Sequence, residues 1–164
     1  MNKLKIIFWI LLLSISCVSN AQNSISVTNI NPIYMDLTPS FNAGLPKNII
    51  TDDSQWLNYT TLVHPSDPTF SITVEIASGS IPEGMEMQIE ASPYMGMSKG
   101  KPGTPTGKIT VTHIPRVLID NIGTSYTGSG RNEGHRITFS FIITDYSKLL
   151  SGITTIYVQY TITQ

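Results

Sequence analysis

The chain has 164 residues, of which 40% are hydrophobic and 13% are charged, and its formal net charge is −1. This near-neutral balance gives no indication of the clustered basic face with which proteins bind the phosphates of nucleic acid. The only cysteine is Cys17, so a framework of disulfides within the chain is excluded as well.

The first 21 residues are typical of a secretory signal peptide. Two lysines precede an unbroken apolar run at residues 6–13, which is too short for a transmembrane helix of roughly 20 apolar residues. The small residues Ser19 and Ala21 occupy the positions that signal peptidase reads. We therefore expect cleavage between Ala21 and Gln22, and an exported chain without a transmembrane segment.

Lipid anchoring at Cys17 is the competing interpretation, because acylation of an exported chain would tether it to a membrane. Lipoprotein signals usually carry leucine three residues before the cysteine, and this chain has Ser14 there. The sequence therefore favours a protein that is secreted or held at the outer cell surface, with the periplasm left open as a third location.

Residues 22–164 have the size of one ordinary domain, since removal of 21 residues from 164 leaves 143. Loss of Lys3 and Lys5 with the signal leaves eight basic residues against eleven acidic ones. We expect one domain, no nucleic-acid partner, and stability that comes from apolar burial and strand pairing.

Apolar and polar residues alternate in several short runs, which is the pattern of half-buried strands. A capping Asp145 followed by Leu149, Leu150 and Gly152 predicts about one helical turn before the last run. The candidate strands are residues 24–30, 56–63, 70–77, 85–91, 108–112, 116–119, 137–143 and 156–162. Residues 31–53 and 92–107 are rich in proline or glycine and are expected to form loops.

The runs 70–77 and 85–91 are expected to pair as a hairpin. The connection 81–84 has proline second and glycine fourth, as a type I turn prefers. A register with Ile76 opposite Met87 and Val74 opposite Ile89 keeps the apolar residues on one face. The expected core residues of this pair are Phe70, Ile72, Val74, Ile76, Met87 and Ile89. Glu75, Glu86 and Glu90 would share the outward face, either as a solvated surface or as an acidic patch.

Short strands with one apolar face must cover each other, so the pattern predicts an all-β fold. We expect a single Ig-like or Greek-key β-sandwich of about eight strands in residues 22–164, after a cleaved signal at residues 1–21.

Little in the sequence points to catalysis or to a metal. His64, His113 and His135 lie far apart and lack the spacing of a metal site. No serine lies in a nucleophile-elbow pattern. We expect a protein that is not an enzyme and carries no cofactor or metal.

The glycine-rich stretch 123–134 is the most distinctive feature. A strand pattern follows it, whereas a phosphate-binding loop needs a helix there. It is either a plain loop with several positive-φ positions or a binding loop that presents Tyr126 and Arg131, with Tyr94 nearby. Trp56 is either a core residue or a stacking platform for a sugar.

Two resemblances follow from short motifs. Residues 78–87, with the sequence SGSIPEGMEM, resemble the turn and strand of Ig-like domains in bacterial surface proteins. Four segments are similar to small secreted proteins of Bacteroidota with Ig-like or fimbrial-type domains: the Asn-Ala-Gln sequence around the cleavage site at residues 20–22, and residues 56–59, 122–128 and 160–163. The resemblance implies a surface location and a structural or adhesive role, with no catalytic residue.

The leading hypothesis is an exported surface subunit whose terminal strands, residues 24–30 and 156–162, join other surface or pilus-like subunits or further copies of itself. The alternative is a carbohydrate- or protein-binding module that uses Tyr126, Arg131 and Tyr94 at one end of the sandwich. A periplasmic housekeeping role is a third possibility.

Overall fold

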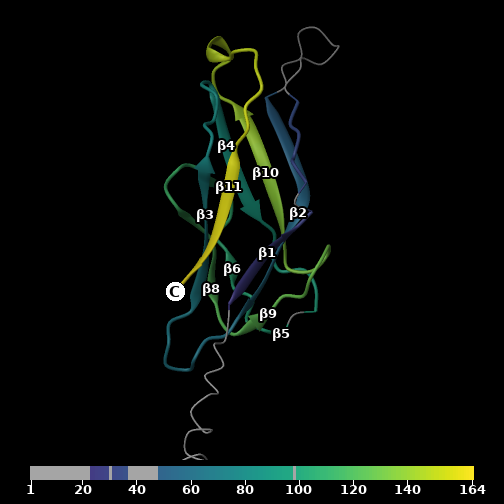
Figure 1. Cartoon of the computed structure of the whole chain (residues 1–164), viewed down its shortest axis with the longest axis vertical. Coiled ribbons are helices and arrows are strands. Elements are labelled where there is room, and N and C mark those ends of the chain that lie inside the picture. Colours follow the sequence, from purple (N-terminus) through teal and green to yellow (C-terminus); the bar gives the residue numbers. More distant parts are fainter. Residues whose placement is uncertain (1–22, 30, 37–47, 98) are drawn as a thin grey trace, which may run out of the picture.

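The computed structural model describes residues 23–29, 31–36, 48–97 and 99–164, so the expected signal, Cys17 and the cleavage site lie outside the described residues. The described chain is all-β, as predicted, and forms a sandwich of two antiparallel sheets (Figure 1).

The seven-stranded layer, called the large sheet, has the order β5-β9-β2-β10-β4-β7, with β1 also paired to β2. Its strands are β1 (Ser24–Thr28), β2 (Ile49–Thr61), β4 (Met85–Ala91), β5 (Lys99–Gly100), β7 (Ile109–Thr110), β9 (Ser125–Tyr126) and β10 (His135–Ile143). The four-stranded layer, called the small sheet, has the order β11-β3-β8-β6. Its strands are β3 (Phe70–Ser78), β6 (Thr104–Pro105), β8 (Arg116–Ile122) and β11 (Tyr157–Thr163).

All eight candidate strands are confirmed, as β1, β2, β3, β4, β7, β8, β10 and β11. The predicted helical turn is a short 3-10 helix, Tyr146–Lys148, capped by the side chain of Asp145. Three two-residue strands, β5, β6 and β9, lie in stretches that we expected to be loops. β2 also begins at Ile49, inside the expected loop 31–53, because β10 pairs with its first residues and the Arg136 guanidinium lies 3.0 Å from the Asp53 carboxylate.

The predicted β3–β4 hairpin is wrong. β3 pairs with β11 and β8 in the small sheet, whereas β4 pairs with β10 and β7 in the large sheet. Their connection turns one residue later than predicted, since the Met85 N–H donates to the Pro82 carbonyl at 3.2 Å and Gly84 adopts a φ of 79°. The alternation of residues determines which face of each strand is apolar, but it does not determine the neighbouring strand. The apolar face of β4 is buried whether β4 lies beside β3 in one sheet or in the sheet opposite to it.

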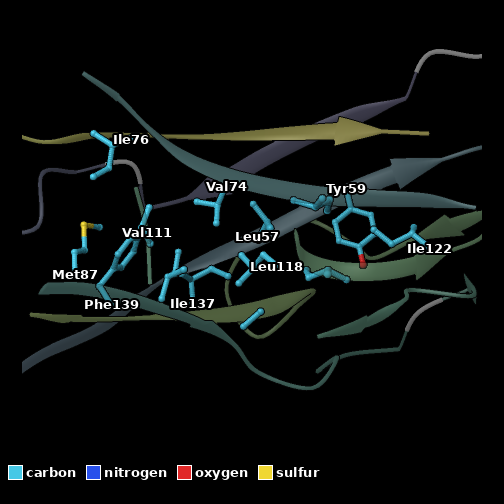
Figure 2. Close-up of a cluster of buried hydrophobic side chains, with 14 of the residues drawn as sticks. Leu57, Tyr59, Val74, Ile76, Met87, Val111, Leu118, Ile122, Ile137 and Phe139 are labelled. Carbon is cyan, nitrogen blue, oxygen red and sulfur yellow. The ribbon is translucent and has the colours of Figure 1, made fainter. Parts of the chain in front are cut away.

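The six residues predicted for the core are nevertheless all buried, because each strand turns its apolar face toward the other sheet and the six side chains belong to one core cluster. Figure 2 shows the packed layer, in which Val74 and Leu118 from the small sheet meet Leu57 and Ile137 from the large sheet. Side chains that are fully inaccessible to solvent include Leu57, Ile72, Ile89, Leu118, Ile119, Ile122 and Ile137.

The crossing from one layer to the other also divides the predicted acidic face. Glu75 lies on the small sheet, while Glu86 and Glu90 lie on the large sheet, so the three carboxylates do not form one patch. Hydrogen bonds from the Thr110 hydroxyl (2.6 Å) and the Gln88 amide (2.7 Å) lower the pKa of Glu86. The carboxylate of Glu86 therefore helps to hold β4 to β7, since it accepts hydrogen bonds from a residue of each strand.

Truncation of a core residue tests this packing. Ile72→Ala is expected to lower the free energy of unfolding by about 2–5 kcal/mol, because it removes a fully buried side chain and leaves a cavity. Ile153→Ala is the matched control, since Ile153 is 100% exposed and its truncation should change stability by less than about 0.5 kcal/mol. Urea unfolding measures both; equal losses would contradict the observed core.

Candidate binding loops at one end of the sandwich

Two loops meet at the end of the sandwich where β5 and β9 lie (Figure 1). Residues 92–97 follow β4, and residues 127–134 join β9 to β10; together they are called the loop pair. The Met95 N–H donates to the Gly134 carbonyl at 2.8 Å, and the Tyr94 hydroxyl donates to the Thr127 carbonyl at 3.3 Å. These bonds hold two segments that lie far apart in the sequence at a fixed separation.

Three rings beneath the loops, from Tyr59, His135 and Tyr94, are called the aromatic trio. Tyr59 stacks on His135 with 5.8 Å between ring centroids and 8° between planes, while Tyr94 meets the imidazole edge-on at 71°. His135 is completely buried. Such ring pairs are worth about 0.5–1.5 kcal/mol beyond the area that they bury.

The imidazole of His135 also joins three backbone segments. Its Nδ1 lies 2.8 Å from the Ser92 carbonyl, and its Nε2 lies 2.9 Å from the Tyr59 hydroxyl, which in turn donates to the Pro102 carbonyl. The Arg136 N–H beside it donates to the Ser92 hydroxyl at 2.9 Å. His135 therefore links the start of the 92–97 loop to β2 and to the segment before β6.

Burial controls the protonation of this cluster. Desolvation lowers the pKa of His135 and outweighs the hydrogen bonds to the Ser92 and Pro102 carbonyls, which favour the charged ring. The neutral ring carries one N–H, which Nδ1 donates to Ser92, so Nε2 accepts from the Tyr59 hydroxyl, whose single proton is then shared between Nε2 and the Pro102 carbonyl. Desolvation likewise raises the pKa of Tyr59, so its hydroxyl stays protonated. The cluster is suited to holding the loops in place and offers no solvent-accessible general base.

Glycines allow the loops to pack closely. Gly134 has a φ of 79°, and a Cβ there would collide with the backbone oxygen of Leu57. Gly128 and Gly96 both lie against the carboxylate of Glu133, which fills the space between the two loops. The positive-φ positions expected in residues 123–134 are present at Gly128, Gly130, Asn132 and Gly134.

The structure brings two of the three predicted site residues onto adjoining segments. Tyr126 lies in β9 between Thr60 of β2 and Lys99 of β5, and 52% of its surface is exposed. Tyr94 is partly buried and is bonded to Thr127, the neighbour of Tyr126. Arg131 is exposed in the turn of the second loop and forms no ion pair with any residue that the structure describes.

Sequence reasoning missed two groups at this end. Met97 is 93% exposed, which is unusual for an apolar side chain and indicates that the loops present apolar surface as well as Tyr126. Tyr59 and His135 were missed as supports because 76 residues separate them. The strand parity of His135 with Ile137 was the only available signal, since it places both side chains on the inner face.

Trp56 is not a platform for a sugar, because only 6% of its surface is exposed. It belongs to four consecutive buried residues of β2, so both faces of the sheet are covered at this point. On the outer face, the neighbouring Asn58 donates to the Glu133 carbonyl at 2.8 Å and accepts from the Thr28 hydroxyl at 2.7 Å. These bonds tie the loop pair to β1.

The other two histidines are placed far from this cluster. His64 bonds to Ser66 in an exposed turn at 2.7 Å, and His113 bonds to the Ile76 carbonyl at 2.9 Å. Within the described ranges, no group of three or more His, Cys, Asp or Glu side chains is close enough to hold a metal ion. No helix in those ranges is long and apolar enough to cross a membrane.

The neutral, buried state of His135 predicts a pH dependence. Its folded pKa lies below the ordinary 6.5, so the unfolded chain takes up the proton first as the pH falls. The contribution of the neutral His135 ring to the free energy of unfolding is fully present above pH 6.5. It is lost as the pH falls toward the folded pKa, by at most about 1.4 kcal/mol per pH unit. Urea unfolding at a series of pH values should show a steeper loss in the native chain than in His135→Gln; parallel curves would contradict a neutral buried ring.

A scan against protein-family models, a search of curated proteins and a search of solved structures each found no match. Function is therefore argued from the geometry of the chain itself.

Proposed function

We propose that this chain is an exported, non-catalytic surface protein with a structural or adhesive role, built on an Ig-like sandwich that joins other subunits through a terminal strand. The observation that carries the proposal is the position of the terminal strands: among the described residues, β1 pairs only with β2, and β11 is the last strand of the small sheet. A strand at a sheet edge presents unpaired N–H and C=O groups, with which another chain can pair.

The two edges of the small sheet differ in a way that supports this role. β6, at one edge, has two residues, one of which is Pro105 and lacks an N–H. β11, at the other edge, has seven residues and contains no proline and no charge. Edge strands are ordinarily protected by short length, proline or charge, and β11 has none of these. An edge of this kind is suited to pairing with another chain.

β1 is already used within its own sheet. All five of its residues pair with β2, and Ile25 and Val27 pack against the core. Donating β1 to another subunit would uncover the β2 edge and part of the apolar layer. The structure therefore favours β11 over β1 as the joining strand.

The non-catalytic part of the proposal is supported by how the polar core residues are used. His135, the buried histidine, bonds to backbone carbonyls and to a tyrosine. None of the described carboxylates bonds to its ring, as the orienting acid of a catalytic triad would.

Export is tested with the full chain made in a bacterium that has an outer membrane. The product is expected to begin at Gln22 by mass spectrometry and to react with a membrane-impermeant label on intact cells. Cys17→Ser is the control and should change neither result, because the cut lies beyond it. An uncleaved chain in the cytoplasm, or a lipid on Cys17, would contradict the proposal in this form.

A second candidate function, binding of a carbohydrate or protein by the loop pair together with the adjoining strand β9, is favoured by the exposed ring of Tyr126 in β9. The ring lies in a short strand next to Lys99, and the residue that follows it, Thr127, is bonded to both Tyr59 and Tyr94. An exposed aromatic ring on a rigid support is suited to stacking on a sugar face. Arg131 and Met97 add charge and apolar area to the same end.

A glycan screen tests this candidate. If a glycan binds here, Tyr126→Ala should weaken its binding at least about tenfold, or about 1.4 kcal/mol, through loss of stacking. Tyr146→Ala is the matched control, since Tyr146 is 51% exposed and belongs to the short 3-10 helix, which lies at the end of the molecule away from β5 and β9 (Figure 1). Equal binding by the two variants would exclude the loop pair as the site.

A further inference from the structure

We propose that β11 pairs with β11 of a second copy of this chain, antiparallel and about a two-fold axis at Tyr160. The two small sheets would then form one continuous sheet. The inference rests on the proposed function and deepens it, because it names the joining strand, its partner and the register.

One hydrogen bond of β3 shows which N–H and C=O groups of β11 bond to β3 and which point to the free edge of the small sheet. The Ile76 N–H donates to the Thr112 carbonyl at 2.8 Å, on the side of β3 away from β11. Because successive peptide groups point to opposite edges, Glu75 and Thr73 direct theirs toward β11, where they lie opposite Gln159 and Thr161.

The N–H and C=O groups of Val158, Tyr160 and Ile162 therefore point to the free edge of β11. β1 of the large sheet comes close to β11, but its pairing is with β2. The alternating groups on this edge form a ready ladder for an antiparallel strand.

A two-fold axis at Tyr160 places apolar side chains of one copy opposite apolar side chains of the other, and polar side chains opposite polar ones. Val158 of one copy lies opposite Ile162 of the other, both on the core-facing side. Gln159 lies opposite Thr161 on the outer side. Within one chain the Gln159 amide already donates to the Thr161 hydroxyl at 3.4 Å, so the same two groups are suited to bonding between copies. The register thus needs no rearrangement of the strand.

The charge pattern fits a second copy better than a charged partner. A two-fold axis brings each residue near its own copy, and like charges opposite each other are destabilising. Residues 149–164 contain no charged side chain, so β11 itself brings no like charges together across a two-fold axis. The charged residue beside it is Glu75 of β3, which lies opposite Gln159 and is one strand further from the axis.

Exposed apolar residues lie at the start of the same segment. Leu150 is 90% exposed, Ile153 is 100% exposed and Tyr157 is 63% exposed. In the proposed register the Thr163 of the second copy lies opposite Tyr157, so the end of its strand would cover apolar surface in addition to the backbone ladder.

The test is light scattering on residues 22–164, which contain every described strand, over a range of protein concentrations. The native sequence is expected to form a dimer. Gln159→Lys combined with Thr161→Lys places lysines directly opposite each other across the axis, and should raise the dissociation constant at least about tenfold. Gln159→Lys combined with Thr161→Glu places lysine opposite glutamate in the same register, and should restore the dimer.

Circular dichroism of each variant checks the fold, since both substitutions lie on the outer face of the small sheet. A native chain that stays monomeric, a double-lysine variant that dimerises as well as the native chain, or a Lys–Glu variant that fails to dimerise would each overturn the proposal. If the chain is exported but stays monomeric, the pairing of β11 is contradicted and the proposed export is not. If the chain dimerises but is never exported, the proposed function is contradicted and the pairing of β11 is not.

Discussion

The shared apolar layer between the two sheets is the constraint on which the rest of the molecule depends. Residues 22–164 contain no cysteine, so no disulfide within them supplements burial. Each sheet has one apolar face that is stable only when the other sheet covers it. The crossing of the chain between β3 and β4 follows from this need, because each sheet gains a strand whose inner residues meet the opposite layer. Ile72 and Ile89, which we expected to be near neighbours in one sheet, are instead buried from opposite sides.

The aromatic trio shows how the same core tolerates polar groups at its end. An unpaired polar group in an apolar interior is destabilising by about 1–3 kcal/mol, so buried polar atoms are normally bonded. Both ring nitrogens of His135 and the hydroxyl of Tyr59 have partners, and these partners are largely backbone carbonyls of neighbouring loops. Satisfying the buried ring therefore fixes the positions of the loops. A rigid end of the sandwich is a consequence of polar burial, whatever the loops bind.

The alternation of apolar and polar residues predicted the longer strands, and it predicted the core faces of Phe70–Ser78 and Met85–Ala91, because that pattern depends on each strand alone. It gave no core face for β8, where the consecutive residues Leu118 and Ile119 are both buried. It did not predict which sheet a strand joins, since Phe70–Ser78 buries the same residues against either neighbour. The first half of β2 was missed because Asp52 and Asp53 interrupt the apolar pattern, and its pairing depends on β10, more than 80 residues later. Tyr126 and Tyr94 were predicted as site residues from residue type and loop context. The supports beneath them depend on contacts between distant segments, which no local pattern contains.

β11 combines two features that a solitary domain would be expected to avoid. Its edge lacks proline and charge, while the opposite edge of the same sheet is short and ends in Pro105. In addition, the Tyr160 hydroxyl is buried without a hydrogen-bond partner among the described residues, and desolvation raises its pKa so that it remains neutral. Both features reduce the stability of an isolated sandwich or its resistance to aggregation. The free edge of β11 could be protected by one substitution to proline or to a charged residue, so its lack of protection supports the proposed pairing with another chain. The Tyr160 hydroxyl is different, because its side chain packs against the core and edge pairing would leave it without a partner; it bears on the stability of the sandwich alone.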